Sequence, residues 1–194
     1  MRLGIVSDIH GNAIALERAI EKMGDIDRLA CLGDAIDQYR FSNEVVGLLK
    51  ERDALTIWGN HEEMFFSPLH PRARSAEWIE PNLLEWLRTR PRRLDLDIGG
   101  QHILLTHATG WSDSYDYVFP HSPDFARFGE CDSDMVLYGH THHPVQCRVQ
   151  DIVVINPGSV GHGRLVDDSI LLSCALLDTD SGEAEILDFC LADG

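Results

Sequence analysis

Seven side chains able to bind metal ions stand just after apolar segments of this sequence. In chain order they are Asp8, His10, Asp34, Asn60, His107, His140 and His142. The apolar segments have the length and composition of buried strands. Because the carboxyl ends of strands in an α/β sheet converge at one edge, we expect the seven side chains to meet there.

The donor set predicts a pair of metal ions. It contains two carboxylates, one amide oxygen and four imidazoles, which exceeds the four ligands of a tetrahedral zinc site and includes no thiolate. Such a set suits two divalent transition-metal ions that share a bridging carboxylate, and Asp34 is the natural bridge. Manganese, iron, zinc, cobalt and nickel all accept these donors.

The charge of the chain indicates the kind of substrate. Sixteen Lys and Arg oppose 32 Asp and Glu, giving a net charge of -16, which repels long polyanions. Two divalent ions against two carboxylates would nevertheless leave the pocket at about +2, and such an ion pair favours phosphate esters. We therefore expect a small phosphate ester as the substrate and do not expect long nucleic acid as a partner.

Length and composition predict one domain over residues 1–194. No apolar run approaches the roughly 18 residues of a membrane span, and the start "MRLGIVSDIHG" lacks the apolar region of a secretory signal. We expect a cytoplasmic protein with no membrane partner and leave the oligomeric state open. The five cysteines have no paired spacing, so we expect reduced thiols.

The first sixty residues alternate between strands and helices. "RLGIV", "DRLACL" and "ALTIW" read as strands, and "NAIALERAIEKM" and "FSNEVVGLLKER" read as helices. Asn12 is the expected N-cap of the first helix, and Ser42 or Asn43 that of the second. This alternation is typical of βαβ units with a buried parallel sheet.

The rest of the chain changes character. Prolines divide residues 62–90 into short amphipathic pieces, which predicts a small helical insert. We expect Trp78 and Trp86 to anchor its core, and the alternative is a platform on which a base stacks. Beyond it, "RRLDLDI" and "QHILLTHA" flank Gly99 and Gly100, a two-residue hairpin signal. Antiparallel strands dominate the second half, so we predict two mixed sheets packed face to face with helices outside.

Five ordered signatures resemble those of calcineurin-like metallophosphoesterases. They are "DIH" at residues 8–10, "GDAID" at 33–37, "GNHE" at 59–62, a lone His107, and "GHTH" at 139–142. The small size, the opening "SDIHGN" and the late "INPGSVG" resemble the compact prokaryotic phosphodiesterase branch. The resemblance implies a four-layer α/β/β/α sandwich, the metallophosphatase fold, and a phosphoesterase that favours diesters over monoesters.

The resemblance also implies a role for each site residue. The first metal would be held by Asp8, His10, Asp34 and His142, and the second by Asp34, Asn60, His107 and His140. A hydroxide bridging the metals would attack phosphorus. His61 would stabilise or protonate the leaving oxygen, and Asp37 would orient His61 by accepting from its other ring nitrogen.

Two positions depart from the family pattern. Protein phosphatases and dinucleoside tetraphosphate hydrolases of the family carry arginines where this chain has Gln38 and Trp58. Neither residue replaces a guanidinium fork, which argues against those two activities. Arg164 occupies a place where this branch often has an arginine, and we predict that it contacts the substrate phosphate.

Two alternatives remain beside the phosphodiesterase. A nuclease would use the same chemistry, although the acidity of the chain opposes binding of long nucleic acid. A non-catalytic protein-interaction scaffold is known for this fold where ligands are lost, whereas every ligand position is filled here. His162, between Gly161 and Gly163, has either a place in the pocket or a solvated role.

Overall fold

The computed structural model of the chain describes residues 1–191 and contains two packed sheets. Neighbouring strands of the first, six-stranded sheet run in the order β11-β10-β1-β2-β3, and β9 pairs with β10. The bounds of these strands are β1 Arg2–Val6, β2 Arg28–Cys31, β3 Leu55–Thr56, β9 Arg164–Val166, β10 Ser169–Asp178 and β11 Ala184–Phe189. Strands β1, β2 and β3 are mutually parallel, as the alternating sequence predicts.

The second sheet has five strands in the order β4-β5-β6-β8-β7. Their bounds are β4 Arg93–Ile98, β5 Gln101–Thr106, β6 Met135–Leu137, β7 Val145–Val149 and β8 Ile152–Asn156. Strands β4 and β5 form the predicted hairpin, and Gly99 and Gly100 both have the positive φ that its two-residue turn requires. Strands β5, β6 and β8 are parallel, so both sheets are mixed.

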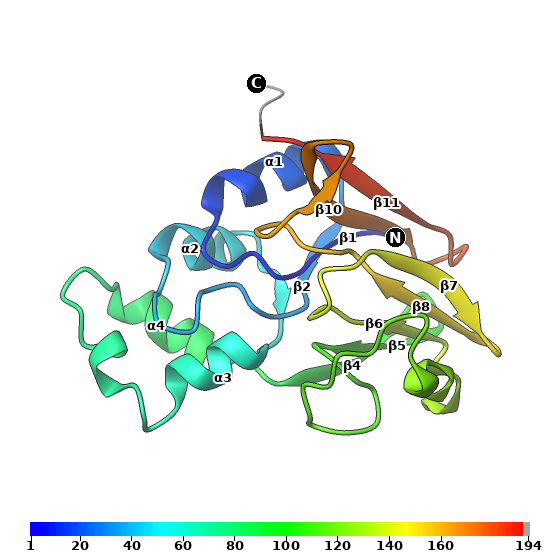
Figure 1. Cartoon of the computed structure of the whole chain (residues 1–194), viewed down its shortest axis with the longest axis horizontal. Coiled ribbons are helices and arrows are strands. Elements are labelled where there is room, and N and C mark those ends of the chain that lie inside the picture. Colours follow the sequence, from blue (N-terminus) through cyan, green and yellow to red (C-terminus); the bar gives the residue numbers. More distant parts are fainter. Residues whose placement is uncertain (192–194) are drawn as a thin grey trace.

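Helices α1 (Ala13–Met23) and α2 (Asn43–Glu51) lie on the outer side of the first sheet (Figure 1). Both predicted caps are present: Asn12 Oδ1 accepts from the Ala15 N–H at 3.1 Å, and Ser42 Oγ accepts from the Val45 N–H at 3.2 Å. Each cap satisfies an otherwise orphaned amide. The helices thus begin immediately beyond the loops that follow β1 and β2.

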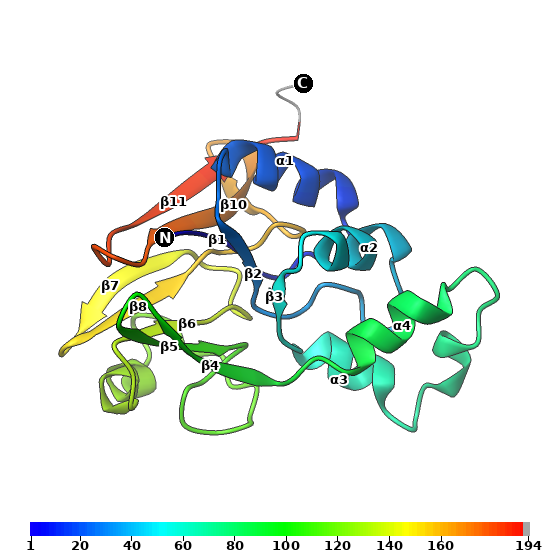
Figure 2. The ribbon, with the colours of Figure 1, turned by 180° about the vertical axis from the view of Figure 1, so that it is seen from behind.

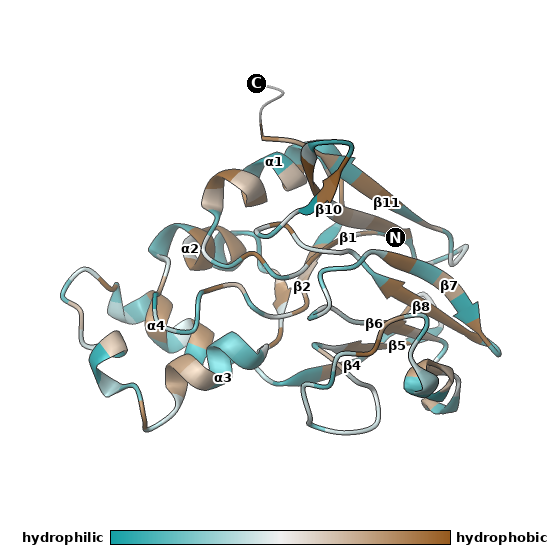
Figure 3. Cartoon of the chain, in the orientation of Figure 1, coloured by the Kyte–Doolittle hydropathy of each residue, from teal (hydrophilic) through white to brown (hydrophobic). Residues whose placement is uncertain are grey.

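Apolar side chains fill the space between the two sheets. Leu3, Ile5 and Ala30 from the first sheet pack with Ile103 and Leu137 from the second, and all are fully buried. The view from behind shows the sheets one above the other, and the hydropathy colouring shows brown strands facing each other (Figures 2 and 3). The predicted sandwich of two mixed sheets flanked by helices is confirmed.

The two outer faces of the sandwich are covered by different helices. The outer face of the second sheet is covered by a short 3₁₀ helix, η2 (Pro123–Glu130), through the buried Phe128 ring. The other helical segments, α3 (Asn60–Phe66), η1 (Pro71–Arg74) and α4 (Pro81–Arg88), lie together beside α2 (Figure 1). Over residues 1–191, no helix is both long and apolar enough to cross a membrane.

The insert corrects one expectation from the sequence. Trp86 packs against buried apolar residues, as predicted, but Trp78 is 53% exposed. Trp58 is structural: its Nε1–H donates to the Leu87 carbonyl at 2.7 Å and its ring stacks on Phe66. The expectation for Trp78 is wrong because its neighbour Ile79, not Trp78, faces the core of the insert.

Candidate metal centre

Six of the seven predicted ligands lie on tight loops that directly follow strands, and Asn60 is the first residue of α3. Five of the seven have positive φ, and these are Asp8, His10, Asp34, His140 and His142. A non-glycine residue in this region costs on the order of 1–3 kcal/mol and persists only where the surroundings fix it. Such clustering of strained residues is typical of a functional site.

Two glycines allow these loops to approach each other. A Cβ on Gly33, which has φ of 96°, would meet the backbone nitrogen of Gly59 at 2.6 Å and His107 Nδ1 at 2.7 Å. A Cβ on Gly59 would collide with the carboxylate of Asp34. The glycines of the "GD" and "GNH" signatures therefore make room for the Asp34 side chain.

Three donor atoms converge beside β1. His10 Nε2 and His142 Nε2 lie 3.2 Å apart, and His142 Nε2 lies 3.2 Å from Asp8 Oδ1. Asp8 Oδ2 accepts from the His140 N–H at 3.0 Å, but Oδ1 is buried and accepts no well-aligned hydrogen bond. A buried carboxylate oxygen facing two imidazole nitrogens is a geometry that a cation completes.

A second group of donors meets at Asp34. Its Oδ1 is fixed by the His61 N–H at 2.8 Å, which leaves Oδ2 to face His107 Nε2 at 3.4 Å. Asn60 Oδ1 lies 3.1 Å from the same His107 nitrogen. Donor atoms of Asp34, His107 and His140 all lie within 4.8 Å of one another, as do those of Asp34, His10 and His61. Asp34 therefore belongs to both groups, the position that a bridging ligand needs.

Backbone carbonyls fix the orientation of two rings. His107 Nδ1–H donates to the Leu32 carbonyl at 2.6 Å, and His140 Nε2–H donates to the Tyr115 carbonyl at 2.9 Å. In each ring the other nitrogen faces the centre, where it would bind a metal ion through its lone pair. This is the usual arrangement of metal-binding histidines.

Burial and charge set the protonation of the cluster. Burial lowers the pKa of His10 and of His140 to about 4, so both rings are neutral at pH 7. Burial opposes the charge on Asp8 and Asp34, but the neighbouring His142 and His107 hold both carboxyl pKa values below their usual range. Burial also disfavours charge on His107, yet Asp34 raises its pKa to about 10.

His61 is the second residue of α3 and lies against the cluster. Its ring centroid is 4.5 Å from that of His10, and its Nε2 is 3.8 Å from Asp34 Oδ2. Its Nδ1 accepts from the backbone N–H of Gln38 at 3.1 Å, whereas Asp37 Oδ1 is 3.6 Å away. The latter distance exceeds a hydrogen bond, so Gln38 is the neighbour that fixes this ring, with Nε2 as its donor.

Glu62 is a buried residue that ties two loops of the site together. Its carboxylate accepts from the N–H groups of Asp34 at 2.8 Å, Gly59 at 2.8 Å and Ile36 at 3.1 Å. Burial, followed by the charge of Asp34, raises its pKa to about 7. Glu62 is part of the "GNHE" signature, but the sequence did not show that it would accept hydrogen bonds from these loops.

Of the two candidate residues that follow Gly161, His162 lies against the cluster and Arg164 is paired elsewhere. His162 stacks on His10 with ring centroids 4.1 Å apart, and it can share a cation with His10 and His142. Arg164, the predicted substrate contact, forms an ion pair with Asp188 at 2.5 Å. The prediction for Arg164 therefore requires that it exchange this partner for a phosphate.

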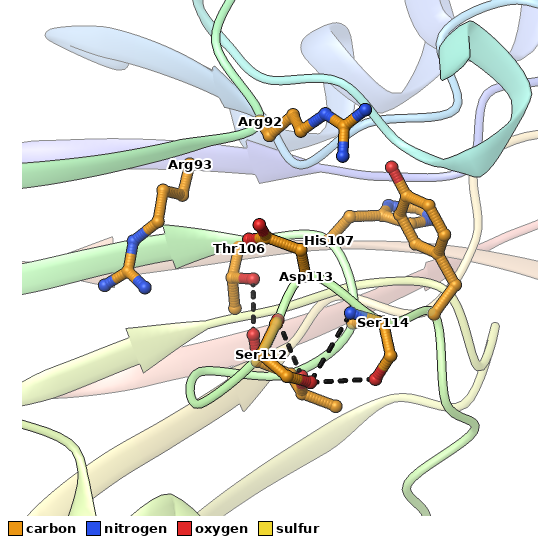
Figure 4. A pocket seen from close by; sticks show the side chains of 10 residues that line it. Arg92, Arg93, Thr106, His107, Ser112, Asp113 and Ser114 are labelled. Atoms are coloured by element: carbon orange, nitrogen blue, oxygen red, sulfur yellow. Dashed lines mark hydrogen bonds between the residues drawn. The ribbon is translucent and has the colours of Figure 1, made fainter.

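The loop after β5 lines a hollow beside His107 and adds residues that the motifs did not reveal. Figure 4 shows this hollow, in which Arg92 lies near His107 and Arg93 extends away. Arg92 pairs with Glu63 at 2.9 Å, and Glu63 also accepts from the Tyr115 hydroxyl at 2.7 Å. This network holds the loop whose Tyr115 carbonyl orients His140. No signature includes Tyr115, so only the fold could show it.

The fold and this cluster are typical of a metal-dependent hydrolase: the strand ends of a two-sheet sandwich gather imidazoles and carboxylates around the buried Asp8 Oδ1, which has no hydrogen-bond donor. The calcineurin-like phosphoesterase superfamily domain matches residues 1–182, and the chain belongs to that family. It is a phosphoric ester hydrolase, and its family implies divalent metal ions.

Several known proteins resemble the chain. A phosphodiesterase of Methanocaldococcus jannaschii is 24% identical over 167 residues, covering 81% of this chain and 83% of the relative. A second protein of that organism is 26% identical over 191 residues, covering 84% and 77%. The crystal structure of a metallophosphoesterase from Sphaerobacter thermophilus superposes with a TM-score of 0.78 at 24% identity, covering 97% of this chain and 88% of that one.

Proposed function

We propose that the protein is a phosphodiesterase that uses two divalent transition-metal ions. The observation that supports two ions is the position of Asp34, whose carboxylate belongs to two donor groups. The first ion would be held by Asp8, His10, Asp34 and His142, and the second by Asp34, Asn60, His107 and His140. Bound there, the ions would generate a nucleophile at neutral pH and neutralise charge on the phosphoryl oxygens.

The residues of the chain have three further tasks in this proposal. Hydrolysis adds the hydroxyl of water to phosphorus and delivers a proton to the ester oxygen that leaves. His61 Nε2–H donates to that oxygen, because its Nδ1 is occupied by the Gln38 N–H. Asp37, within 3.6 Å of the ring, would stabilise it when it carries a positive charge. Arg164 is the proposed additional phosphate contact.

Diesters are favoured over monoesters because the centre lacks arginines at the two family positions. Trp58 is committed to the insert through its bond to Leu87, and Gln38 contributes its backbone to His61. A dianionic monoester gains more than a monoanionic diester from a guanidinium fork. The expected substrate is a small phosphodiester.

The Asp34→Asn variant tests the proposal. We expect it to lose both metal ions and at least about 100-fold of the activity on bis(p-nitrophenyl) phosphate, because an amide cannot bridge two cations. Metal content by mass spectrometry and the diesterase rate should fall together. The matched control is Asp97→Asn on β4, which should keep both. A variant that retains two ions would contradict the bridging role.

A further inference from the structure

A hollow beside the cluster opens between α2 and the insert. It encloses about 270 Å³, and its lining is His10, Gly11, Asp37, Arg40, Phe41, Ser42, Glu44 and Trp78. His10 and Asp37 are also the immediate neighbours of His61. The hollow therefore begins where the proposed leaving oxygen would lie.

Trp78 is held at this hollow by its backbone. The Asn43 amide donates to the Trp78 carbonyl at 2.7 Å and accepts from the Glu80 N–H at 3.0 Å. Ile79 between them is buried in the insert. Because the backbone on both sides is fixed, the 53% exposed indole is presented to the hollow without a packing role that would explain it.

The remaining lining offers hydrogen-bonding groups of both kinds. In the part of the chain that the structure describes, the Arg40 guanidinium has no hydrogen-bond or ion-pair partner, so its donors are available. Asp37 and Arg40 exchange two backbone hydrogen bonds, at 3.2 and 3.1 Å, which fixes that turn. The carboxylates of Asp37 and Glu44 are acceptors. An indole face beside donors and acceptors matches a flat ring with a polar edge.

We propose that this hollow, named here the Trp78 pocket, binds the leaving group of the substrate and selects a nucleobase-like ring stacked on Trp78. The proposal rests on the phosphodiesterase function and gives it a substrate class, a diester of a nucleoside. The volume lies just below the roughly 300–1,000 Å³ of pockets for drug-sized ligands. This size suits a single nucleoside as the bound group.

Nucleoside binding tests the pocket independently of catalysis. We expect adenosine to bind the full-length protein, measured by calorimetry, and expect Trp78→Ala to weaken that binding about tenfold, the scale of a lost base stack. Trp78→Phe should restore most of the affinity. Leu69→Ala, which truncates a 79% exposed side chain on the same insert, is the matched control and should change nothing.

Kinetics separates this proposal from the proposed function. In the metal-loaded enzyme, Trp78→Ala should lower kcat/KM for 2′,3′-cyclic adenosine monophosphate about tenfold and leave inhibition by inorganic phosphate unchanged. Diester hydrolysis without Trp78-dependent adenosine binding would overturn the pocket and leave the phosphodiesterase intact. Trp78-dependent binding without hydrolysis of any diester would overturn the phosphodiesterase and retain a nucleoside site.

Discussion

At the scale of single residues, the centre is a set of strained loops fixed from several sides. Asp34 illustrates this, because its φ is 51°, its N–H is held by Glu62 and its Oδ1 by the His61 N–H. The first bond fixes the backbone of Asp34 and the second fixes its carboxylate, so only Oδ2 faces the cluster. The backbone strain is confined to these loops. Neighbouring groups hold the strained residues in place, and they can come this close because Gly33 and Gly59 have no side chain.

Gly59→Ala tests how closely these loops must approach. A methyl group here collides with the Asp34 carboxylate, so we expect metal affinity and diesterase activity to fall by about 10- to 100-fold, the usual effect of disturbing a residue that supports a ligand. Gly47→Ala in α2 is the control, since its methyl would meet only Leu83 at 3.7 Å. Equal metal affinity in both variants would contradict this role of Gly59.

His61→Ala should act on the leaving group. Positioned proton donors contribute about 10²–10⁴-fold, so we expect a fall in kcat of that order on esters with alkoxide leaving groups. With p-nitrophenolate, which needs no proton, the fall should be much smaller. Both metal ions should remain bound. His102→Ala on β5 is the control. Full diesterase rates on alkoxide esters would refute the assignment of His61.

At the scale of elements, the sequence was informative wherever a local rule decides the structure. The caps at Asn12 and Ser42, the Gly99–Gly100 turn and the strand ends that carry Asp8 and Asp34 follow local rules. Contacts between distant segments decide the rest.

Tertiary contacts account for what the sequence missed. "ALTIW" gives only the two-residue β3, because Trp58 turns into the insert and bonds to Leu87. Trp78 lies in a turn and is exposed because Asn43 of α2 fixes its backbone. Tyr115 reaches His140 through a loop whose path follows from the Glu63 contact. Such contacts between distant segments leave no periodic pattern in the sequence.

The loop after β5 also covers a predicted ligand. Tyr117, itself 62% exposed, stacks on His140 with ring centroids 4.0 Å apart. We expect Tyr117→Ala to admit water to this ring and to raise the dissociation constant of the metal that His140 would hold several-fold, while kcat at saturating metal is unchanged. Tyr117→Phe should behave like the parent protein. Metal titration followed by activity and by calorimetry measures both variants, and an unchanged dissociation constant would contradict the covering role.

At the scale of the whole molecule, the candidate metal centre lies where the two sheets and the insert meet. Its predicted ligands come from loops after β1, β2, β5 and β6 and from the start of α3. Ions bound there would join both halves of the sandwich. In a chain of net charge -16, they would also relieve repulsion between the buried carboxylates of Asp8 and Asp34, since the charge of Asp34 disfavours ionisation of Asp8.

Removal of the metals should therefore lower the stability of the entire fold. A ligand that binds only the native state at about 100 times its Kd adds about 2.7 kcal/mol, and for a chain of this size about 1 kcal/mol corresponds to roughly 2–4 °C in Tm. We expect a chelator to lower Tm by about 5–10 °C per occupied site, measured by scanning calorimetry at fixed metal concentration. Asp34→Asn should not respond to added metal. If that variant showed the same rise in Tm, the stabilising ions would be bound to the acidic surface and not between the sheets.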